Sequence, residues 1–161
     1  MKKRIEDLIV TKNRRLNTEF FVLTLTSSGQ IPQILPGQFA ELLIDHSPET
    51  FLRRPFSVYD VDYNENTLDL LIKIAGKGTS ILSKIKEGST VNMIYPLGNS
   101  FSIPAGKNIL LVGGGTGVAP LLLLGKYLND KADISPVFLF GYRSADLIVE
   151  QKRFEKIGKV E

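Results

Sequence analysis

The sequence contains no cysteine and a single histidine among its 161 residues. The absence of cysteine excludes a disulfide framework, a thiolate metal site and a cysteine nucleophile within these residues. The lone histidine, His46, excludes a multi-histidine metal site and most histidine-based triads. Because His46 is followed by Ser47 and Pro48, we expect it to lie in a surface loop. We therefore predict no metal site here, and no catalytic acid or base is visible, so no catalytic residue is assigned.

Long hydrophobic runs are also missing. The longest apolar stretch, residues 118–124, is far shorter than the roughly 20 residues of a membrane span. The charged N-terminus is not followed by the apolar run of a signal peptide. The net charge is only +3, and no basic stripe alternates with aromatic residues. We expect a cytoplasmic protein that binds neither membrane nor nucleic acid.

Hydrophobic residues make up 43% of the chain and charged residues 23%, as in globular proteins with a buried core. Short strands separated by turn residues are predicted at 20–26, 38–44, 51–59, 67–75 and 90–95, with 60–66 as a turn and one helix at 79–85. In the fourth strand, Leu68, Leu70, Ile72 and Ile74 share one face. This pattern predicts an antiparallel β-barrel.

The pattern changes near residue 104. An apolar strand at 108–112, a helix at 118–128, a second strand at 137–140 and a helix at 145–157 follow in turn. This alternation predicts a doubly wound α/β domain. Only two of its usual five or six strands are visible. We expect a barrel domain at 1–102 and a partial nucleotide-binding α/β domain at 103–161.

Three segments could bind a ligand. In Arg54-Pro55-Phe56-Ser57, an arginine that can grip a diphosphate stands two residues before an aromatic ring on the same strand face. An edge strand with an exposed arginine pair and a core phenylalanine explains the same pattern.

The second segment, residues 73–80, could bind a phosphate at the N-terminus of a helix that begins after Gly76 and Gly78. Thr79 suits the N-cap of that helix. An ordinary strand-to-helix turn is the alternative.

The third segment, residues 113–120, follows a buried strand and has four glycines within five residues. Each glycine costs chain entropy on folding, which is compensated if the backbone must approach a pyrophosphate at a helix N-terminus. Pro120 suits the first turn of that helix. The spacing matches neither the strict Gly-x-Gly-x-x-Gly pattern nor a P-loop, and a tight turn without ligand is the alternative.

In this order, the segments resemble those of the ferredoxin–NADP reductase superfamily over essentially the whole chain. Arg54-Pro55-Phe56-Ser57 is similar to its Arg-x-Tyr-Ser flavin motif, with Phe56 in place of tyrosine. The resemblance implies that Arg54 binds the FAD pyrophosphate, Phe56 lines the isoalloxazine and Ser57 lies near the reactive nitrogen. Residues 113–120 are similar to the NAD(P)H loop, and residues 141–144 to the Gly-x-Arg segment near the nucleotide.

Within that superfamily, the chain most resembles the electron-transfer subunits of bacterial class 1B dihydroorotate dehydrogenases. The resemblance implies electron transfer between NAD(H) or NADP(H), FAD and an FMN-containing catalytic subunit in pyrimidine biosynthesis, in a dimer or hetero-oligomer. That family also carries a two-iron, two-sulfur cluster on four cysteines, for which this chain has no ligands. The flavin subunit of a ferredoxin–NADP or sulfide-type oxidoreductase, and a cofactor-free partner-binding remnant, are alternatives. The residues expected to bind cofactors are Arg54, Pro55, Phe56, Ser57, Leu71, Ile72, Lys73, Gly76, Gly78, Thr79, Gly113, Gly114, Gly115, Thr116 and Gly117.

Overall fold

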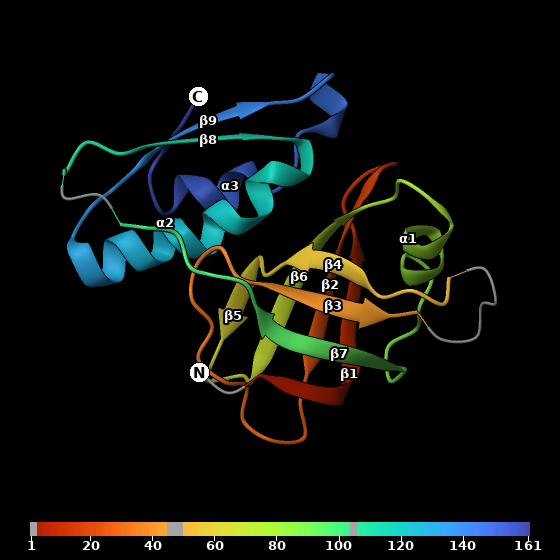
Figure 1. The fold of residues 1–161 in the computed structure, drawn as a ribbon. Helices are drawn as coiled ribbons and strands as arrows, with labels where there is room; N and C mark the ends of the chain where they lie inside the picture. The colour runs from red at the N-terminus through yellow and green to blue at the C-terminus, as the bar shows by residue number, and fades with distance from the viewer. Residues whose placement is uncertain (1–2, 45–49, 104–105) are drawn as a thin grey trace.

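The structure, a computed structural model, describes residues 3–44, 50–103 and 106–161. Within these ranges the chain forms an antiparallel sheet followed by a smaller parallel sheet with helices (Figure 1). The first sheet, together with α1 (Lys77–Leu82), is called the barrel below. The second sheet with its helices is called the α/β unit.

Seven described strands form the barrel sheet in the order β4-β3-β7-β1-β2-β6-β5. All of their pairings are antiparallel, and the sheet curls into a half-barrel whose end strands, β4 and β5, are not paired with each other (Figure 1). The strands are β1 (Arg4–Arg15), β2 (Phe20–Thr26), β3 (Phe39–Leu43), β4 (Arg54–Ser57), β5 (Asp60–Asp62), β6 (Thr67–Lys73) and β7 (Thr90–Leu97).

Side-chain alternation builds the barrel core. On β6, Leu68, Leu70 and Ile72 are buried inside the barrel, as predicted from their shared face, and Ile74 packs against them. The opposite face of the same strand carries Leu71, which belongs to a second core. The strand is therefore apolar on both faces because it separates two cores.

The α/β unit has three described parallel strands in the order β10-β9-β8. Of these strands, β8 and β9 were predicted and β10 was not. Strand β10 follows a short helix and pairs with β9. The elements are β8 (Leu110–Gly114), a 3₁₀ turn (Gly115–Val118), α2 (Ala119–Ala132), β9 (Val137–Gly141), a second 3₁₀ turn (Ala145–Leu147), α3 (Gln151–Glu155) and β10 (Lys159–Val160).

The helices of the α/β unit lie between its sheet and the barrel (Figure 1). The second core spans this junction. From the barrel it includes Phe20, Val22 and Leu71, and from the helices it includes Leu122 and Phe154. Because these side chains are at most 3% exposed, the two units share one continuous hydrophobic contact.

Several predicted boundaries were wrong. Residues 145–157 do not form one helix, because Ile148 is extended and Glu150 has a left-handed backbone with φ of 57°. The strand expected at 51–59 is shorter, and part of the turn expected at 60–66 is strand β5. The long first strand, β1, was not anticipated. Hydrogen bonds between distant segments decide these elements, and a local pattern does not contain them.

His46 and residues 104–105 lie outside the described residues, so their predicted conformations are not tested. None of the described helices has the length and apolar character needed to span a bilayer. Among the described side chains, no group of three or more potential ligands is arranged to hold a metal ion.

Candidate functional site

A cavity of about 500 Å³ opens between the barrel and the α/β unit, and it is called the inter-unit cavity below. Ligand sites commonly occur at such junctions and have this size. Ten of the fifteen residues predicted to bind cofactors line it. Its lining consists of Arg54, Pro55, Phe56, Ser57, Leu71, Ile72, Lys73, Ala75, Thr79, Thr116, Gly117, Ala119 and Pro120.

Strand β4 supplies the whole Arg-x-x-Ser segment to this cavity. Arg54 donates hydrogen bonds to the carbonyl oxygens of Leu52, at 2.8 Å, and Arg53, at 3.3 Å. Within the described ranges no carboxylate lies within ion-pair distance of its guanidinium. The adjacent Arg53 instead bonds across to β7, where its guanidinium contacts the backbone and side chain of Asn92. The two neighbouring arginines therefore have different surroundings.

Thr79 reaches the inter-unit cavity from the first turn of α1, but it is not the N-cap that we predicted. Gly76 occupies that position, and the Thr79 hydroxyl accepts hydrogen bonds from the backbone N–H groups of Ala75 and Gly76 at 2.9 and 3.2 Å. Gly78 does not line the cavity, but a Cβ there would lie 2.7 Å from the Ile44 side chain. A glycine at 78 therefore lets the turn pack closely against Ile44, the residue that follows β3.

The glycine-rich loop divides between two cavities. Thr116 and Gly117 line the inter-unit cavity, whereas Gly114 and Gly115 line a neighbouring cavity of about 390 Å³, called the glycine-loop cavity below. Gly115 has φ of 54°, a conformation that favours glycine. Gly113 lines neither cavity, and a Cβ on it would lie 2.9 Å from Leu121 and 3.2 Å from backbone.

The glycine-loop cavity lies at the carboxyl ends of β8 and β9, where open parallel sheets bind ligands. It shares one residue, Lys73, with the inter-unit cavity. Its lining residues are Glu19, Phe20, Lys73, Gly114, Gly115, Gly141, Tyr142, Arg143 and Leu147.

Glu19 links the two units at this cavity. Its carboxylate forms one ion pair with the Lys73 ammonium of the barrel, at 2.9 Å, and a second with the Arg143 guanidinium of the α/β unit, at 2.7 Å. The hydrogen bond from Lys73, together with the charges of both cations, lowers the pKa of the Glu19 carboxyl. Arg143 is 73% exposed, so its side chain can turn toward an incoming anion at little cost.

Five predicted residues stand apart from the inter-unit cavity, namely Gly76, Gly78, Gly113, Gly114 and Gly115, the last two of which line the other cavity. Sequence reasoning missed Glu19 and Phe20, which carry no motif. The predicted list of cofactor-binding residues also omitted Ala75, Ala119 and Pro120, although they lie inside the segments 73–80 and 113–120 named above. A larger cavity of about 770 Å³, lined by residues such as Leu43, Ile81 and Ile85, contains none of the predicted residues.

The barrel matches a known protein family. The family model of the oxidoreductase FAD-binding domain matches residues 7–101, which is more than half of the chain. The chain belongs to the oxidoreductase FAD-binding domain family. The matched residues include the whole barrel sheet apart from the start of β1, and they contain the Arg54 to Ser57 segment.

One curated relative is "Dihydroorotate dehydrogenase B (NAD(+)), electron transfer subunit" of Caldanaerobacter subterraneus subsp. tengcongensis. The chain is 40% identical to it over 152 residues, and the match covers 94% of this chain and 57% of that protein. It is 34% identical over 160 residues to the protein of the same name from Lysinibacillus sphaericus, covering 97% and 61%. The chain thus spans about three fifths of the length of these curated relatives.

Among solved structures, the NADH-dependent reduced ferredoxin-NADP oxidoreductase involved in flavin-based electron bifurcation has a TM-score of 0.85 and 30% identity. That match covers 95% of this chain and 55% of the other. Phthalate dioxygenase reductase has a TM-score of 0.78 at 19% identity, covering 98% and 51%, which shows a shared fold alone. The predicted fold, an antiparallel barrel followed by a partial α/β unit, is confirmed.

Proposed function

We propose that this chain binds FAD in the inter-unit cavity and a nicotinamide nucleotide in the glycine-loop cavity, and that it passes electrons between them. One observation carries the proposal: the two cavities share Lys73, so ligands in them would lie beside the same side chain. Electron transfer by hydride exchange needs this proximity. We also propose a boundary near residue 102 between the flavin and nucleotide domains.

The lining of the inter-unit cavity fits a flavin. Arg54 would bind the diphosphate, because its guanidinium has no carboxylate partner among the described residues and offers paired donors. Phe56 would lie against the ring system and Ser57 near a ring nitrogen. The remaining predicted residues would complete the site from β4, from β6 and from the turn and helix start that follow β6, namely Pro55, Leu71, Ile72, Lys73, Gly76, Gly78 and Thr79.

The α/β unit fits a dinucleotide. The glycines of residues 113–117 leave the backbone open to a ligand beside the N-terminal end of α2, where free N–H groups can bind a phosphate. Arg143 adds an exposed cation at the same sheet edge. Bound FAD would supply the redox chemistry, accepting a hydride from the nicotinamide and releasing the electrons singly. The protein residues would position both ligands, and none of them needs to act as an acid or base.

We infer that the complete protein is the electron-transfer subunit of a class 1B dihydroorotate dehydrogenase, acting in pyrimidine biosynthesis with an FMN-containing catalytic subunit. The names of the curated relatives support this assignment. The sequence contains no cysteine, so an iron–sulfur cluster with thiolate ligands does not fit these residues. Residues outside this chain would have to hold one.

The alternative is the flavin subunit of an NADH-dependent ferredoxin-NADP oxidoreductase, a structure that is 30% identical with a TM-score of 0.85. The names of the curated relatives, up to 40% identical, favour the first assignment over it. The partner separates the two. Transfer of electrons to a dihydroorotate dehydrogenase catalytic subunit would support the first assignment, and transfer only to ferredoxin would support the second.

The direct test is anaerobic mixing of the FAD-loaded protein with NADH or NADPH while the flavin absorbance is followed. We expect NADH to bleach the flavin, in keeping with the NAD(+) in the relatives' name. A protein that takes up FAD but is reduced by neither nucleotide would restrict the function to flavin binding. A protein that takes up no FAD would contradict the proposal.

A further inference from the structure

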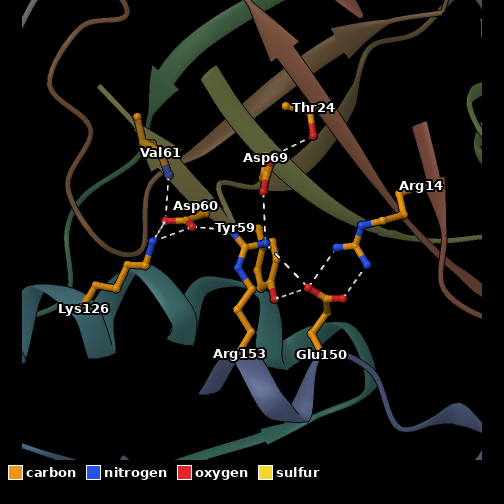
Figure 2. A network of polar contacts seen from close by, with 9 residues as sticks. All are labelled: Arg14, Thr24, Tyr59, Asp60, Val61, Asp69, Lys126, Glu150 and Arg153. Atoms are coloured by element: carbon orange, nitrogen blue, oxygen red, sulfur yellow. Dashed lines mark hydrogen bonds and ion pairs between the residues drawn. The ribbon is translucent and has the colours of Figure 1, made fainter. Parts of the chain in front are cut away.

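A cluster of six charged side chains joins the barrel to the α/β unit (Figure 2). Three are acidic and three are basic, so the charges balance within the cluster. The barrel contributes Arg14, Asp60 and Asp69, and the α/β unit contributes Lys126, Glu150 and Arg153. Every acid therefore has at least one basic partner from the other unit, and the cluster ties together five secondary-structure elements.

Arg153 lies at the centre of the cluster. One end nitrogen of its guanidinium donates to Asp69 at 3.1 Å and the other donates to Asp60. Its guanidinium carbon also lies 4.9 Å from the centre of the Tyr59 ring. Burial opposes the charge, but the nearby Tyr59, Asp60 and Asp69 outweigh that effect and raise the pKa of Arg153. Arg153 thus stays charged and contacts two strands of the barrel at once.

Glu150 is the second link between the units. Arg14 donates two parallel hydrogen bonds to its carboxylate, at 2.7 and 3.0 Å, and only 11% of the Glu150 side chain is exposed. Its backbone adopts φ of 57°, which costs energy for a residue with a Cβ. This conformation breaks the helix that the sequence predicts and turns the carboxylate toward β1. The local backbone is thus fitted to a contact with the other unit.

The cluster lies at one end of a strand whose other end reaches both cavities. On β6, Asp69, Leu71 and Lys73 share the face toward the α/β unit: Asp69 binds Arg153, and Lys73 lines the two cavities. Four residues of strand span about 13 Å. A rotation of the α/β unit about this cluster would therefore move the glycine loop relative to the barrel side of the inter-unit cavity.

Hydrophobic contact alone does not fix such an angle, because it is non-directional. Buried ion pairs often add little stability compared with apolar residues, but they demand a particular geometry. Paired guanidinium–carboxylate contacts are the most directional of these. The balanced cluster therefore suits orientation better than it suits stability.

We propose that Arg153 is a positioning residue that holds the α/β unit at the angle where its glycine loop faces the flavin cavity. Its effect on electron transfer rests on the proposed function, whereas its effect on the angle between the units does not. The two effects are therefore tested separately.

The first test compares Arg153→Met with Lys152→Met, a control that removes an exposed charge from the same helix. We expect the Arg153 variant to retain FAD and to be reduced normally by dithionite, which needs no nucleotide site. Its rate of flavin reduction by NADH, per bound flavin, should fall at least tenfold, while the control stays within twofold of the parent. Arg153→Lys should recover part of the rate, because lysine keeps the charge but not the paired donors. An unchanged NADH rate in Arg153→Met would overturn the proposal.

The second test measures the angle directly and needs neither ligand. The chain has no cysteine, so two introduced cysteines, Lys86→Cys in the barrel and Lys131→Cys in the α/β unit, can be spin-labelled selectively. We expect one narrow distance distribution in the parent and a broader or displaced one after Arg153→Met. Asp69→Asn provides a milder variant should Arg153→Met fold poorly, and it should broaden the distribution to a smaller extent. Narrow, unshifted distributions in both folded variants would overturn the proposal even if NADH reduction fails in the parent.

Discussion

Replacing Arg54 with alanine should weaken FAD binding by roughly 10- to 150-fold. In the structure Arg54 lines the inter-unit cavity and bonds only to the carbonyls of Leu52 and Arg53 among the described residues. A hydrogen bond to a charged group contributes about 1.5–3 kcal/mol, and every 1.4 kcal/mol corresponds to a tenfold change in Kd. The substitution removes no hydrophobic core residue, so the loss should appear in affinity and not in folding.

The assay is a titration of the flavin-free protein with FAD, followed by quenching of flavin fluorescence. Arg53→Ala is the matched control, because Arg53 is the adjacent arginine but contacts Asn92 on β7. We expect Arg53→Ala to change the FAD affinity by less than threefold. Equal affinities of the parent and Arg54→Ala would refute the assignment of the diphosphate to Arg54. Equal losses in both variants would mean that total charge, and not position, governs binding.

Three further results are expected. Gly158→Ala should lower the free energy of unfolding, measured in urea, by about 1–3 kcal/mol, because the added Cβ would lie 2.0 Å from the Pro136 carbonyl oxygen. Unchanged stability would mean that α3 and β10 are packed differently. Phe154→Ala should cost about 3–5 kcal/mol in the same assay, because Phe154 is fully buried where the two units meet, and a loss below 1 kcal/mol would contradict that burial. Burial opposes ionisation of Glu150, but the hydrogen bonds and the charge of Arg14 prevail and lower the pKa of Glu150 below the usual 4.5. The contribution of Glu150 to stability is therefore complete above pH 4.5 and is lost as the pH falls through the lowered pKa of the folded protein. Glu150→Gln should flatten that part of an acid unfolding curve, and an unaltered curve would exclude Glu150 from the acid response.

The strands and the loop that could be predicted are those whose signals lie in neighbouring residues. Residues 20–26 form β2 with the predicted bounds, and β6 begins at the predicted Thr67. Both strands carry β-branched and apolar residues between clear turn signals. The glycine loop also follows a strand and precedes α2, as its composition indicated. That strand, β8, is not buried on both faces as predicted, because Leu110 and Val112 are exposed. Each of these features is encoded within about ten neighbouring residues.

Contacts between distant residues account for what could not be predicted. The expected helix at 145–157 is broken at Glu150, whose carboxylate bonds to Arg14, 136 residues earlier. Glu19 joins the candidate site only because Lys73 and Arg143 meet there after folding. Neither pairing leaves a signal in one sequence. By contrast, Arg54 to Ser57 could be assigned to the site because all four residues lie together on one strand.

The central claim, that this chain is a flavoprotein, is tested most directly by a visible absorption spectrum of the purified protein, with chromatography of the flavin released on denaturation. The proposed function predicts a yellow protein that releases FAD in an amount close to one per chain. A colourless protein that also fails to take up added FAD would contradict it.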